Sequence, residues 1–192
     1  MKGKSIIREI FNIPDNMNVI GFGAAYDIDN PNSMKGSYHL INAVSNLSNE
    51  KKYFAVVFGP AGTEFLSHIN IPYFSTGYIS NPIILSTIYN LCDVFVNPSL
   101  IENLPYTCLE SICCGVPVTA FNVGGTSDII EHKKNGYLAT PYNDEELAFG
   151  IEYCLEHHEE LSKYCIEKAN KDFNTDETVK KYINVYKQVL KY

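Results

Sequence analysis

The chain has 192 residues, 45% of them hydrophobic, with a formal net charge of −7 at pH 7 and a pI near 5.2. This length fits one domain, or one lobe of a larger protein, and supplies enough apolar residues for a core. The acidic balance and the lack of a basic cluster argue against sequence-independent binding to nucleic acid. We expect no signal peptide and no transmembrane segment, hence a cytoplasmic protein, because charges interrupt the N-terminal apolar run and no stretch approaches the roughly 20 apolar residues of a membrane span.

Short apolar runs bounded by turn signals predict six strands. These runs are residues 19–24, 53–58, 71–74, 93–97, 116–120 and 135–139. Helical patterns lie between and after them, at residues 35–47, 63–68, 83–92, 105–115, around 129–130, at 144–171 with a break, and at 176–190. Strands that alternate with helices at this spacing indicate an α/β fold with a mostly parallel, doubly wound sheet.

Two carboxylates, Glu102 and Glu110, flank the junction between the predicted strand 93–97 and the helix that follows it. Pro105 suits the first helical turn, where its missing N–H costs nothing, so we expect Glu102 in the loop and Glu110 on the helix. At about 1.5 Å per residue, Glu110 lies roughly 7 to 8 Å beyond Pro105 along the helix axis. Open α/β sheets bind ligands at such junctions, and carboxylates accept hydrogen bonds from sugar hydroxyls. The pair therefore predicts a site for an extended ligand such as a nucleotide sugar.

The diphosphate of such a ligand needs cationic or amide donors, which this acidic chain offers only locally. Lys35 stands at the start of the first predicted helix, and glycine turns follow two strands, at Gly23 and at Gly124-Gly125. Helix N-termini add backbone amides at these positions. Taken singly, each signal also fits an ordinary helix start or turn, so the order of the signals along the chain carries the prediction.

The six cysteines predict neither a metal centre nor a disulfide framework, because no C-x-x-C pair occurs among them. We expect reduced thiols that serve mainly in packing. His157 and His158 precede two glutamates on a predicted helix and are expected on a solvated face rather than at a metal.

Taken in order, the motifs from about residue 19 to 192 closely resemble the C-terminal, donor-binding half of a family 4 glycosyltransferase with the two-lobed GT-B fold. Glu102 and Glu110 match the Glu-x7-Glu motif of that family, and Lys35-Gly36 matches its helix start. The other matching segments are residues 76–79, 93–99, 114–118, 124–130 and 135–138. The resemblance implies a Rossmann-like donor-binding domain at 18–192, an interdomain linker remnant at 1–17, and an N-terminal acceptor lobe that is absent from this chain.

The resemblance implies transfer of a hexose from a UDP- or GDP-sugar with retention at the anomeric carbon, without a metal or other cofactor. It implies that Glu110 binds the ribose, that Glu102 contacts the donor sugar, and that Lys35 neutralises the leaving diphosphate as charge grows in the transition state. The other donor-binding positions that it implies are Gly23, Gly124 and Gly125, the base loop Gly77, Tyr78 and Ile79, and the backbone amides of Asn103 and Leu104.

The acceptor implied by the resemblance is a glycan or a lipid-linked glycan, chosen mainly by the missing lobe. Because the reaction takes place between the lobes, we expect the isolated chain to bind nucleotide but to transfer little or no sugar. The helix at 176–190 is expected to cross back toward that lobe. Polysaccharide biosynthesis, and association of the whole enzyme with the inner face of the cytoplasmic membrane, are implied at the level of the family.

The chain departs from the family at one phosphate contact. An arginine usually follows the glycine of the first strand, whereas this chain has Gly23-Ala24-Ala25. Either donor binding is weaker or another residue compensates.

Three other interpretations stay open at this point. A nucleotide-sugar epimerase of the same two-lobed architecture is disfavoured by the intact spacing of Glu102 and Glu110. A Rossmann dehydrogenase is disfavoured because Gly21 and Gly23 are not followed by a third glycine, position 26 being Tyr26. A domain that binds nucleotide sugar without catalysis of its own fits the same residues.

Overall fold

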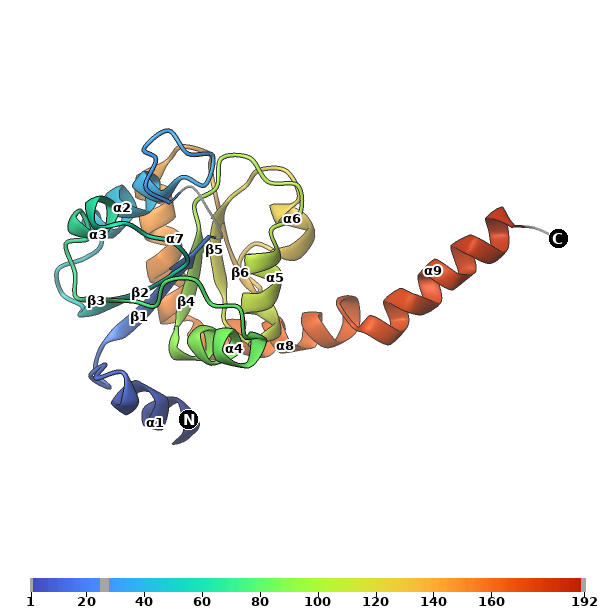
Figure 1. The fold of residues 1–192 in the computed structure, drawn as a ribbon, viewed down its shortest axis with the longest axis horizontal. Helices are drawn as coiled ribbons and strands as arrows, with labels where there is room; N and C mark the ends of the chain where they lie inside the picture. Colours follow the sequence, from blue (N-terminus) through green and yellow to red (C-terminus); the bar gives the residue numbers. More distant parts are fainter. Residues whose placement is uncertain (1, 25–27, 191–192) are drawn as a thin grey trace.

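The computed structural model describes residues 2–24 and 28–190, with the side chains of 6–24 and 28–190. A single parallel sheet lies at the centre, in the order β3-β2-β1-β4-β5-β6 (Figure 1). Its strands are β1 (Asn18–Gly23), β2 (Tyr53–Phe58), β3 (Tyr73–Ser75), β4 (Val94–Asn97), β5 (Val118–Phe121) and β6 (Gly136–Ala139). Every neighbouring pair is parallel. The predicted fold class, a doubly wound α/β sheet, is confirmed.

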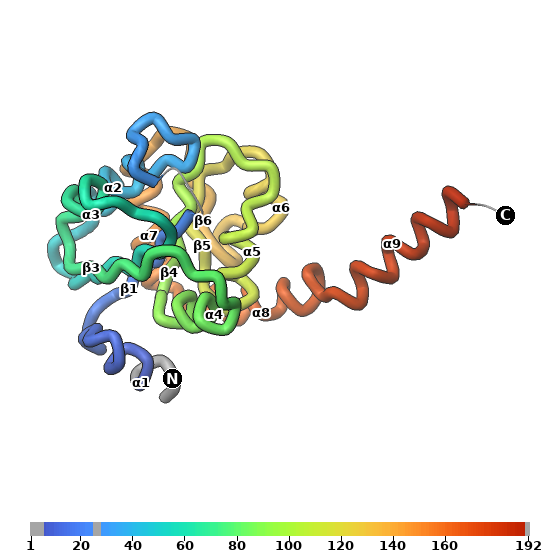
Figure 2. Tube along the Cα trace, in the orientation of Figure 1, coloured from blue at the N-terminus to red at the C-terminus, as the bar shows by residue number. Residues whose placement is uncertain are grey.

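Helices cover both faces of the sheet (Figures 1 and 2). They are α1 (Lys2–Ile10), α2 (Ser37–Ser45), α3 (Thr63–Ser67), α4 (Pro82–Leu91), α5 (Tyr106–Cys113), α6 (Thr126–Ile129), α7 (Asp144–Glu156), α8 (His158–Asp172) and α9 (Thr175–Val189). Residues of α2, α3 and α7 share one hydrophobic cluster with one face of the strands, and residues of α4, α5 and α6 share a second cluster with the other face. Because both faces are covered, the central strands β2 and β4 are buried at every position.

The predicted elements all form, with shifts at some ends. The third and fifth strands begin at Tyr73 and Val118 rather than at 71 and 116. Pro105 is the N-cap of α5, one position before the first turn where it was expected. Gly115 follows the end of α5 with φ 74°, the left-handed conformation that commonly ends helices at glycine.

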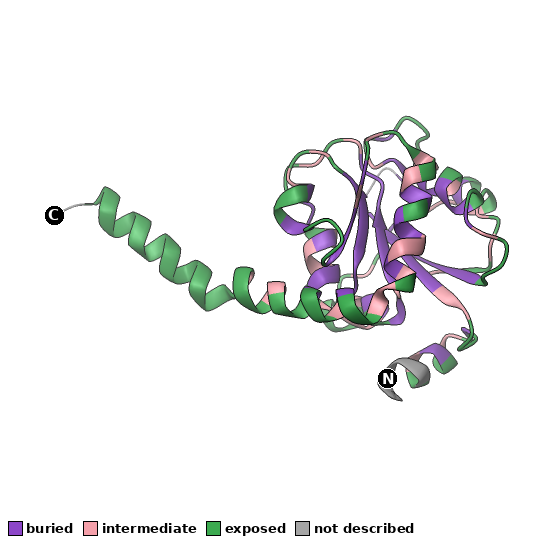
Figure 3. Cartoon of the chain, turned by 180° about the vertical axis from the view of Figure 1, so that it is seen from behind, coloured by how far each residue is buried: buried purple, intermediate pink, exposed green. Residues whose placement is uncertain are grey.

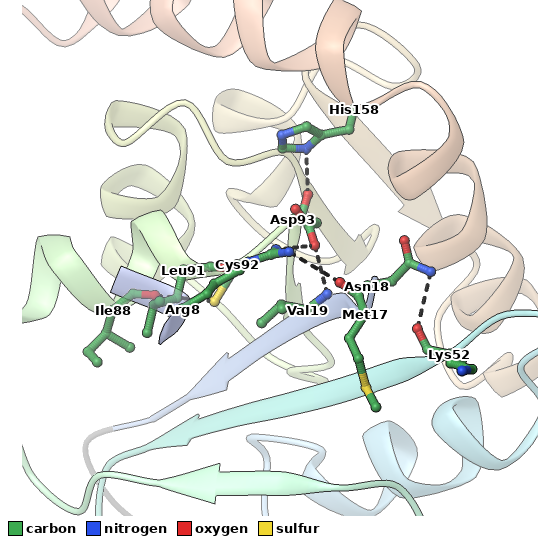
Figure 4. A network of polar contacts seen from close by, with 10 residues as sticks. All are labelled: Arg8, Met17, Asn18, Val19, Lys52, Ile88, Leu91, Cys92, Asp93 and His158. Carbon is green, nitrogen blue, oxygen red and sulfur yellow. Dashed lines mark hydrogen bonds and ion pairs between the residues drawn. The ribbon is translucent and has the colours of Figure 1, made fainter. Parts of the chain in front are cut away.

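The N-terminal segment contains a helix that the sequence did not reveal, α1, within the predicted linker 1–17. Arg8 of α1 is 7% exposed and forms an ion pair with Asp93, Nη2 to Oδ2, at 2.6 Å (Figure 4). It also donates hydrogen bonds to the carbonyl oxygens of Met17 and Leu91. The same Asp93 oxygen accepts the backbone N–H of Val19 at 2.7 Å. One carboxylate thus ties α1 to the start of β1 and to the segment before β4.

The expectation that His157 and His158 lie on a solvated face is wrong for His158. Its Nδ1 lies 2.8 Å from the carbonyl oxygen of Asp93, and the residue is half-buried (Figure 4). His157 is the residue between α7 and α8. The break in the predicted helix 144–171 therefore falls where α8 turns to contact the amino end of β4.

The last helix, α9, extends away from the sheet and its covering helices (Figures 1 and 3). None of its residues is buried. Its apolar side chains, among them Val179, Ile183 and Tyr186, are 49%, 44% and 59% exposed. The crossing of this helix to another lobe stays a prediction. Within residues 2–24 and 28–190, no helix has the length and apolar character needed to cross a bilayer.

Candidate functional site

The candidate site lies where the order of the strands reverses. Chain connections lead from β1 outward through β2 to β3, and then back across to β4 on the other side of β1. In doubly wound sheets, ligands bind in the crevice beyond the carboxyl ends of strands at this point. Here the carboxyl ends of β1 and β4 border a cavity of about 210 Å³. Its lining residues are Phe22, Gly23, Ala24, Lys35, Asn97, Ser99, Glu102, Leu104, Pro105, Tyr106 and Thr107.

An ion pair between Lys35 and Glu102 lies in this cavity. Lys35 Nζ is 2.9 Å from Oε1 of Glu102, and the two side chains are only 22% and 12% exposed. The loops that carry them are joined by a hydrogen bond from the N–H of Leu100 to the carbonyl of Met34 at 2.8 Å. Lys35 lies in the loop before α2, which begins at Ser37, rather than on the helix itself. Lys35, predicted to bind phosphate, and Glu102, predicted to bind the sugar, are therefore in direct contact in the free protein.

Glycines allow these loops to approach each other. Gly36 has φ 64°, and a Cβ atom there would overlap the carbonyl oxygen of Pro98. Gly124 has φ 48°, and a Cβ atom there would overlap the carbonyl oxygen of Glu102. The N–H of Gly125 also points at the carbonyl of Glu102, at 3.4 Å. The turn Gly124-Gly125 thus packs against the backbone of the Glu102 loop and supports it. This structural role is separate from the donor contact predicted for the turn.

Replacing Gly124 with alanine is expected to lower the free energy of unfolding by about 3 kcal/mol, because the new Cβ meets a backbone atom in addition to the strain of a left-handed residue. Gly77→Ala is the matched control. Gly77 has φ 67° but nothing lies within 4 Å of its added Cβ, so only the backbone strain of about 1 kcal/mol applies. Urea unfolding of both variants measures the two free energies. Equal losses of stability in the two variants would contradict the proposal that Gly124 supports the Glu102 loop.

Glu110 lies on α5, as predicted, one turn beyond the cavity-lining residue Tyr106. Its Oε2 accepts a hydrogen bond from the hydroxyl of Tyr89 at 2.9 Å. Tyr89 comes from α4 and is 1% exposed. Nothing in the sequence around Glu110 indicated this partner, because Tyr89 looks like any apolar-face position of its helix.

The cavity brings together only some of the predicted site residues. Gly23, Lys35, Glu102 and Leu104 line it. The loop 77–79, predicted to hold the base, lies further along the same edge of the sheet, where the N–H of Gly59 donates to the carbonyl of Gly77 at 2.8 Å, and Tyr78 is 72% exposed. The predicted residues outside the lining are Gly77, Tyr78, Ile79, Asn103, Glu110, Gly124 and Gly125. Asn97, Ser99, Tyr106 and Thr107 also line the cavity, although none of them was predicted as a site residue; Asn97 and Ser99 belong to the matching segment 93–99.

Two further expectations concern the first turn after β1. Ala24, at the position where the resembled family has an arginine, is described and lines the cavity. The neighbouring Ala25 and Tyr26 lie outside the described residues.

A second hollow, of about 280 Å³, lies at the opposite edge of the sheet, between the start of β6 and α8. Four of its charged side chains are in ion pairs with one another: Lys168 Nζ lies 3.0 Å from both Glu131 Oε1 and Asp172 Oδ2, and Lys134 Nζ lies 3.1 Å from Glu131 Oε2. This hollow is remote from the carboxyl ends of the strands, so we place the ligand site at the Lys35–Glu102 cavity.

No thiol near the site is prepared for nucleophilic chemistry. All six cysteines are thiols that form no disulfide, as expected. Burial raises the pKa of Cys108 to about 12, so it stays a neutral thiol beside Asn97. Within the described residues, no group of three or more His, Cys, Asp or Glu side chains could hold a metal ion. Among the described residues, the polar groups that line the cavity are the Lys35 ammonium group, the Glu102 carboxylate, the Asn97 amide and the hydroxyl groups of Ser99, Tyr106 and Thr107.

Comparison with known proteins assigns the chain to a family. The model of the family "Glycosyl transferases group 1" matches residues 4–172. The chain belongs to this family. An uncharacterized glycosyltransferase of Methanocaldococcus jannaschii, MJ1607, is 34% identical over 107 residues, which make up 54% of this chain and 27% of the relative.

Several solved structures share the fold of this chain. Anabaena Alr3699/HepE in complex with UDP and glucose matches 97% of this group 1 chain with a TM-score of 0.81 at 21% identity. The C-terminal domain of a group 1 family protein, LpcC, from Francisella tularensis matches 91% of the chain with a TM-score of 0.73 at 18% identity, over 95% of its own length. The chain spans 52% of the Anabaena protein, so it corresponds to about half of that relative.

Proposed function

We propose that this chain is the donor-binding, C-terminal domain of a family 4 retaining glycosyltransferase with the GT-B fold. The observation that carries the proposal is the Lys35–Glu102 ion pair in the cavity between the carboxyl ends of β1 and β4. A nucleotide diphosphate sugar offers what this pair can bind, namely phosphate oxygens for the ammonium group and hydroxyl groups for the carboxylate. The membership of the glycosyl transferases group 1 supports this assignment.

In the proposed complex the donor extends along the edge of the sheet. Its diphosphate lies at Lys35 and Gly23, its sugar at Glu102 and the amides of Asn103 and Leu104, its ribose at Glu110, and its base at the loop 77–79. The Anabaena structure contains UDP and glucose, which favours a UDP-sugar over a GDP-sugar for this chain. No metal or cofactor enters the proposed reaction.

Lys35 has the main electrostatic role in the proposed reaction. When the bond between the anomeric carbon and the diphosphate oxygen breaks, its electron pair stays on the diphosphate. The Lys35 ammonium group stabilises that charge without moving far, because its loop is fixed to the Glu102 loop by the Leu100–Met34 hydrogen bond. The acceptor oxygen then forms its bond to the anomeric carbon on the same face of the sugar, and its proton passes to the oxygen of the departing diphosphate.

The whole enzyme would add an N-terminal lobe that holds a glycan or lipid-linked acceptor and closes over the donor. The Francisella domain, a C-terminal domain whose structure was solved by itself, matches this chain over 95% of its length, which supports the assignment to that half. The exposed α9 would cross to the other lobe. Polysaccharide synthesis at the inner face of the cytoplasmic membrane is the setting that we propose for the full-length enzyme.

Calorimetric titration of the chain with UDP, GDP and ADP, and with their glucose, galactose and mannose conjugates, tests the proposal. We expect selective binding of one nucleotide and a loss of about tenfold or more in affinity in Glu110→Ala, because a carboxylate hydrogen bond to the ribose is charge-assisted. Glu145→Ala, an exposed acid on α7, is the control for the change in net charge. Absence of binding by the chain at millimolar nucleotide would contradict the proposal, and rapid sugar transfer by the isolated chain would contradict the need for a second lobe.

A further inference from the structure

Tyr89 joins the hydrophobic core to the carboxylate that we assign to the ribose. Its hydroxyl donates to Oε2 of Glu110 at 2.9 Å. Within the described residues, the Glu110 side chain has no other hydrogen bond, so Oε1 is left for a ligand. A glutamate on a helix surface ordinarily samples several rotamers, and ordering it on ligand binding costs free energy.

The ring of Tyr89 is held by two aromatic neighbours from the sheet. Phe58 of β2 and Phe95 of β4 lie 5.2 and 5.4 Å from it between ring centroids, at interplanar angles of 74° and 66°. These are the edge-to-face contacts that aromatic rings prefer. Because the core fixes the ring, it also fixes the position of the hydroxyl group.

The direction of the hydrogen bond is fixed as well. Burial, and then the charge of Glu110, raise the pKa of Tyr89 far above its ordinary value. The phenol therefore keeps its proton and donates it, and the Glu110 carboxylate accepts.

We propose that Tyr89 is a positioning residue that holds Oε2 of Glu110 and leaves Oε1 aimed at the sugar hydroxyls of the nucleotide, so that it sets the preference for a ribonucleotide. The inference rests on the proposed function, in which Glu110 binds the ribose. Without the Tyr89 hydroxyl, the Glu110 side chain loses its fixed rotamer. The preference for ribose over a sugar without hydroxyls then falls, whereas contacts to the base and diphosphate stay the same.

The test compares Tyr89→Phe with Tyr53→Phe in titrations with UDP and GDP, each beside its 2′,3′-dideoxy analogue. Tyr53 is a matched control, because it is also buried, at 6% exposure, and donates to a carboxylate, Oε1 of Glu152, at 3.1 Å. We expect the original chain and Tyr53→Phe to prefer the ribonucleotide by about tenfold, as one charge-assisted hydrogen bond predicts. Tyr89→Phe is expected to prefer it by less than about threefold, with unchanged affinity for the dideoxy analogue.

The outcomes separate this inference from the proposed function. Binding of neither nucleotide by the original chain overturns both. If the original chain binds the ribonucleotide and the dideoxy analogue with equal affinity, nucleotide binding stands but the proposed role of Tyr89 is overturned. The role is also overturned if Tyr89→Phe keeps the full preference for the ribonucleotide.

If Tyr89→Phe does not fold, the variants Glu110→Gln and Tyr89→Phe/Glu110→Gln replace it, since the double variant leaves no half-buried carboxylate without its donor. We expect both to show the same weak preference, because Tyr89 acts through Glu110. A further loss of preference in the double variant would overturn the inference.

Discussion

Replacing Lys35 with methionine is expected to weaken binding of UDP by roughly 10- to 150-fold, the equivalent of about 1.5–3 kcal/mol for a hydrogen bond to a charged group. Methionine keeps the length and the apolar stem of lysine but removes the ammonium group. Ala24 rather than an arginine stands directly after Gly23, and Lys35 is the one basic residue among the described residues that line the cavity. Titration calorimetry at low and high salt measures the loss, which should shrink as salt screens the phosphate charge.

Replacing Glu102 with glutamine is expected to change the affinity for UDP in the opposite direction. In the free protein, Glu102 occupies one donor direction of the Lys35 ammonium group at 2.9 Å, and its negative charge repels an incoming diphosphate. The neutral amide has the same shape, so we expect UDP to bind about threefold to tenfold more tightly, the change expected for removal of a partly exposed charge from the phosphate site. The sugar-bearing donor should lose that advantage, because the carboxylate that accepts its hydroxyl hydrogens is gone.

Asp128→Asn is the matched control for this pair of results. Asp128 is an exposed acid in the first turn of α6, next to the glycine turn behind Glu102, and its removal changes the net charge by the same amount. We expect its affinities for UDP and UDP-sugar to change equally and by less than about twofold, as for a screened surface charge. If Glu102→Gln weakened UDP and the UDP-sugar to the same extent, the assignment of Lys35 to phosphate and Glu102 to sugar would be wrong.

The sequence predicted what depends on neighbours along the chain. Each apolar run predicted a strand, and the run 53–58 predicted both ends of β2, which is buried at every position; the other five strands differ from their runs by one or two residues at an end. The placement of Glu102 in a loop and Glu110 on a helix followed from the strand before them and from Pro105. The glycines at 124 and 125 were recognised as a turn.

What the sequence did not predict depends on residues that meet only after folding. Glycine is required at position 124 because a Cβ atom there would overlap the carbonyl oxygen of Glu102, a contact that no local pattern indicates. Tyr89 and Glu110 are separated by 21 positions and by a strand, and a tyrosine on the buried side of α4 looks like a packing residue. Lys35 and Glu102 were each predicted as ligand-binding residues, yet their mutual ion pair arises because the sheet places β1 beside β4.

Asp93→Ala is expected to lower the free energy of unfolding by about 3–5 kcal/mol, because it leaves the buried guanidinium of Arg8 without its counter-ion. Arg8 lies 2.6 Å from Asp93, with side-chain exposures of 9% and 18%. The Val19 amide loses an acceptor in the same variant. At roughly 2–4 °C per kcal/mol for a chain of this size, the melting temperature should fall by about 6–20 °C. Calorimetric or circular-dichroism melting measures the shift.

A double-mutant cycle with Arg8→Met decides whether the N-terminal segment belongs to the domain. The double variant Arg8→Met/Asp93→Ala should be more stable than Asp93→Ala, since no buried charge is left without a partner. Lys180→Met removes an exposed ion pair with Glu177 and should cost less than about 0.5 kcal/mol. If Arg8→Met costs as little as Lys180→Met, residues 1–17 act as a linker, as the sequence suggests. A coupling of several kcal/mol would instead move the domain boundary to a point before α1, because a helix that stabilises the sheet to that degree unfolds together with it.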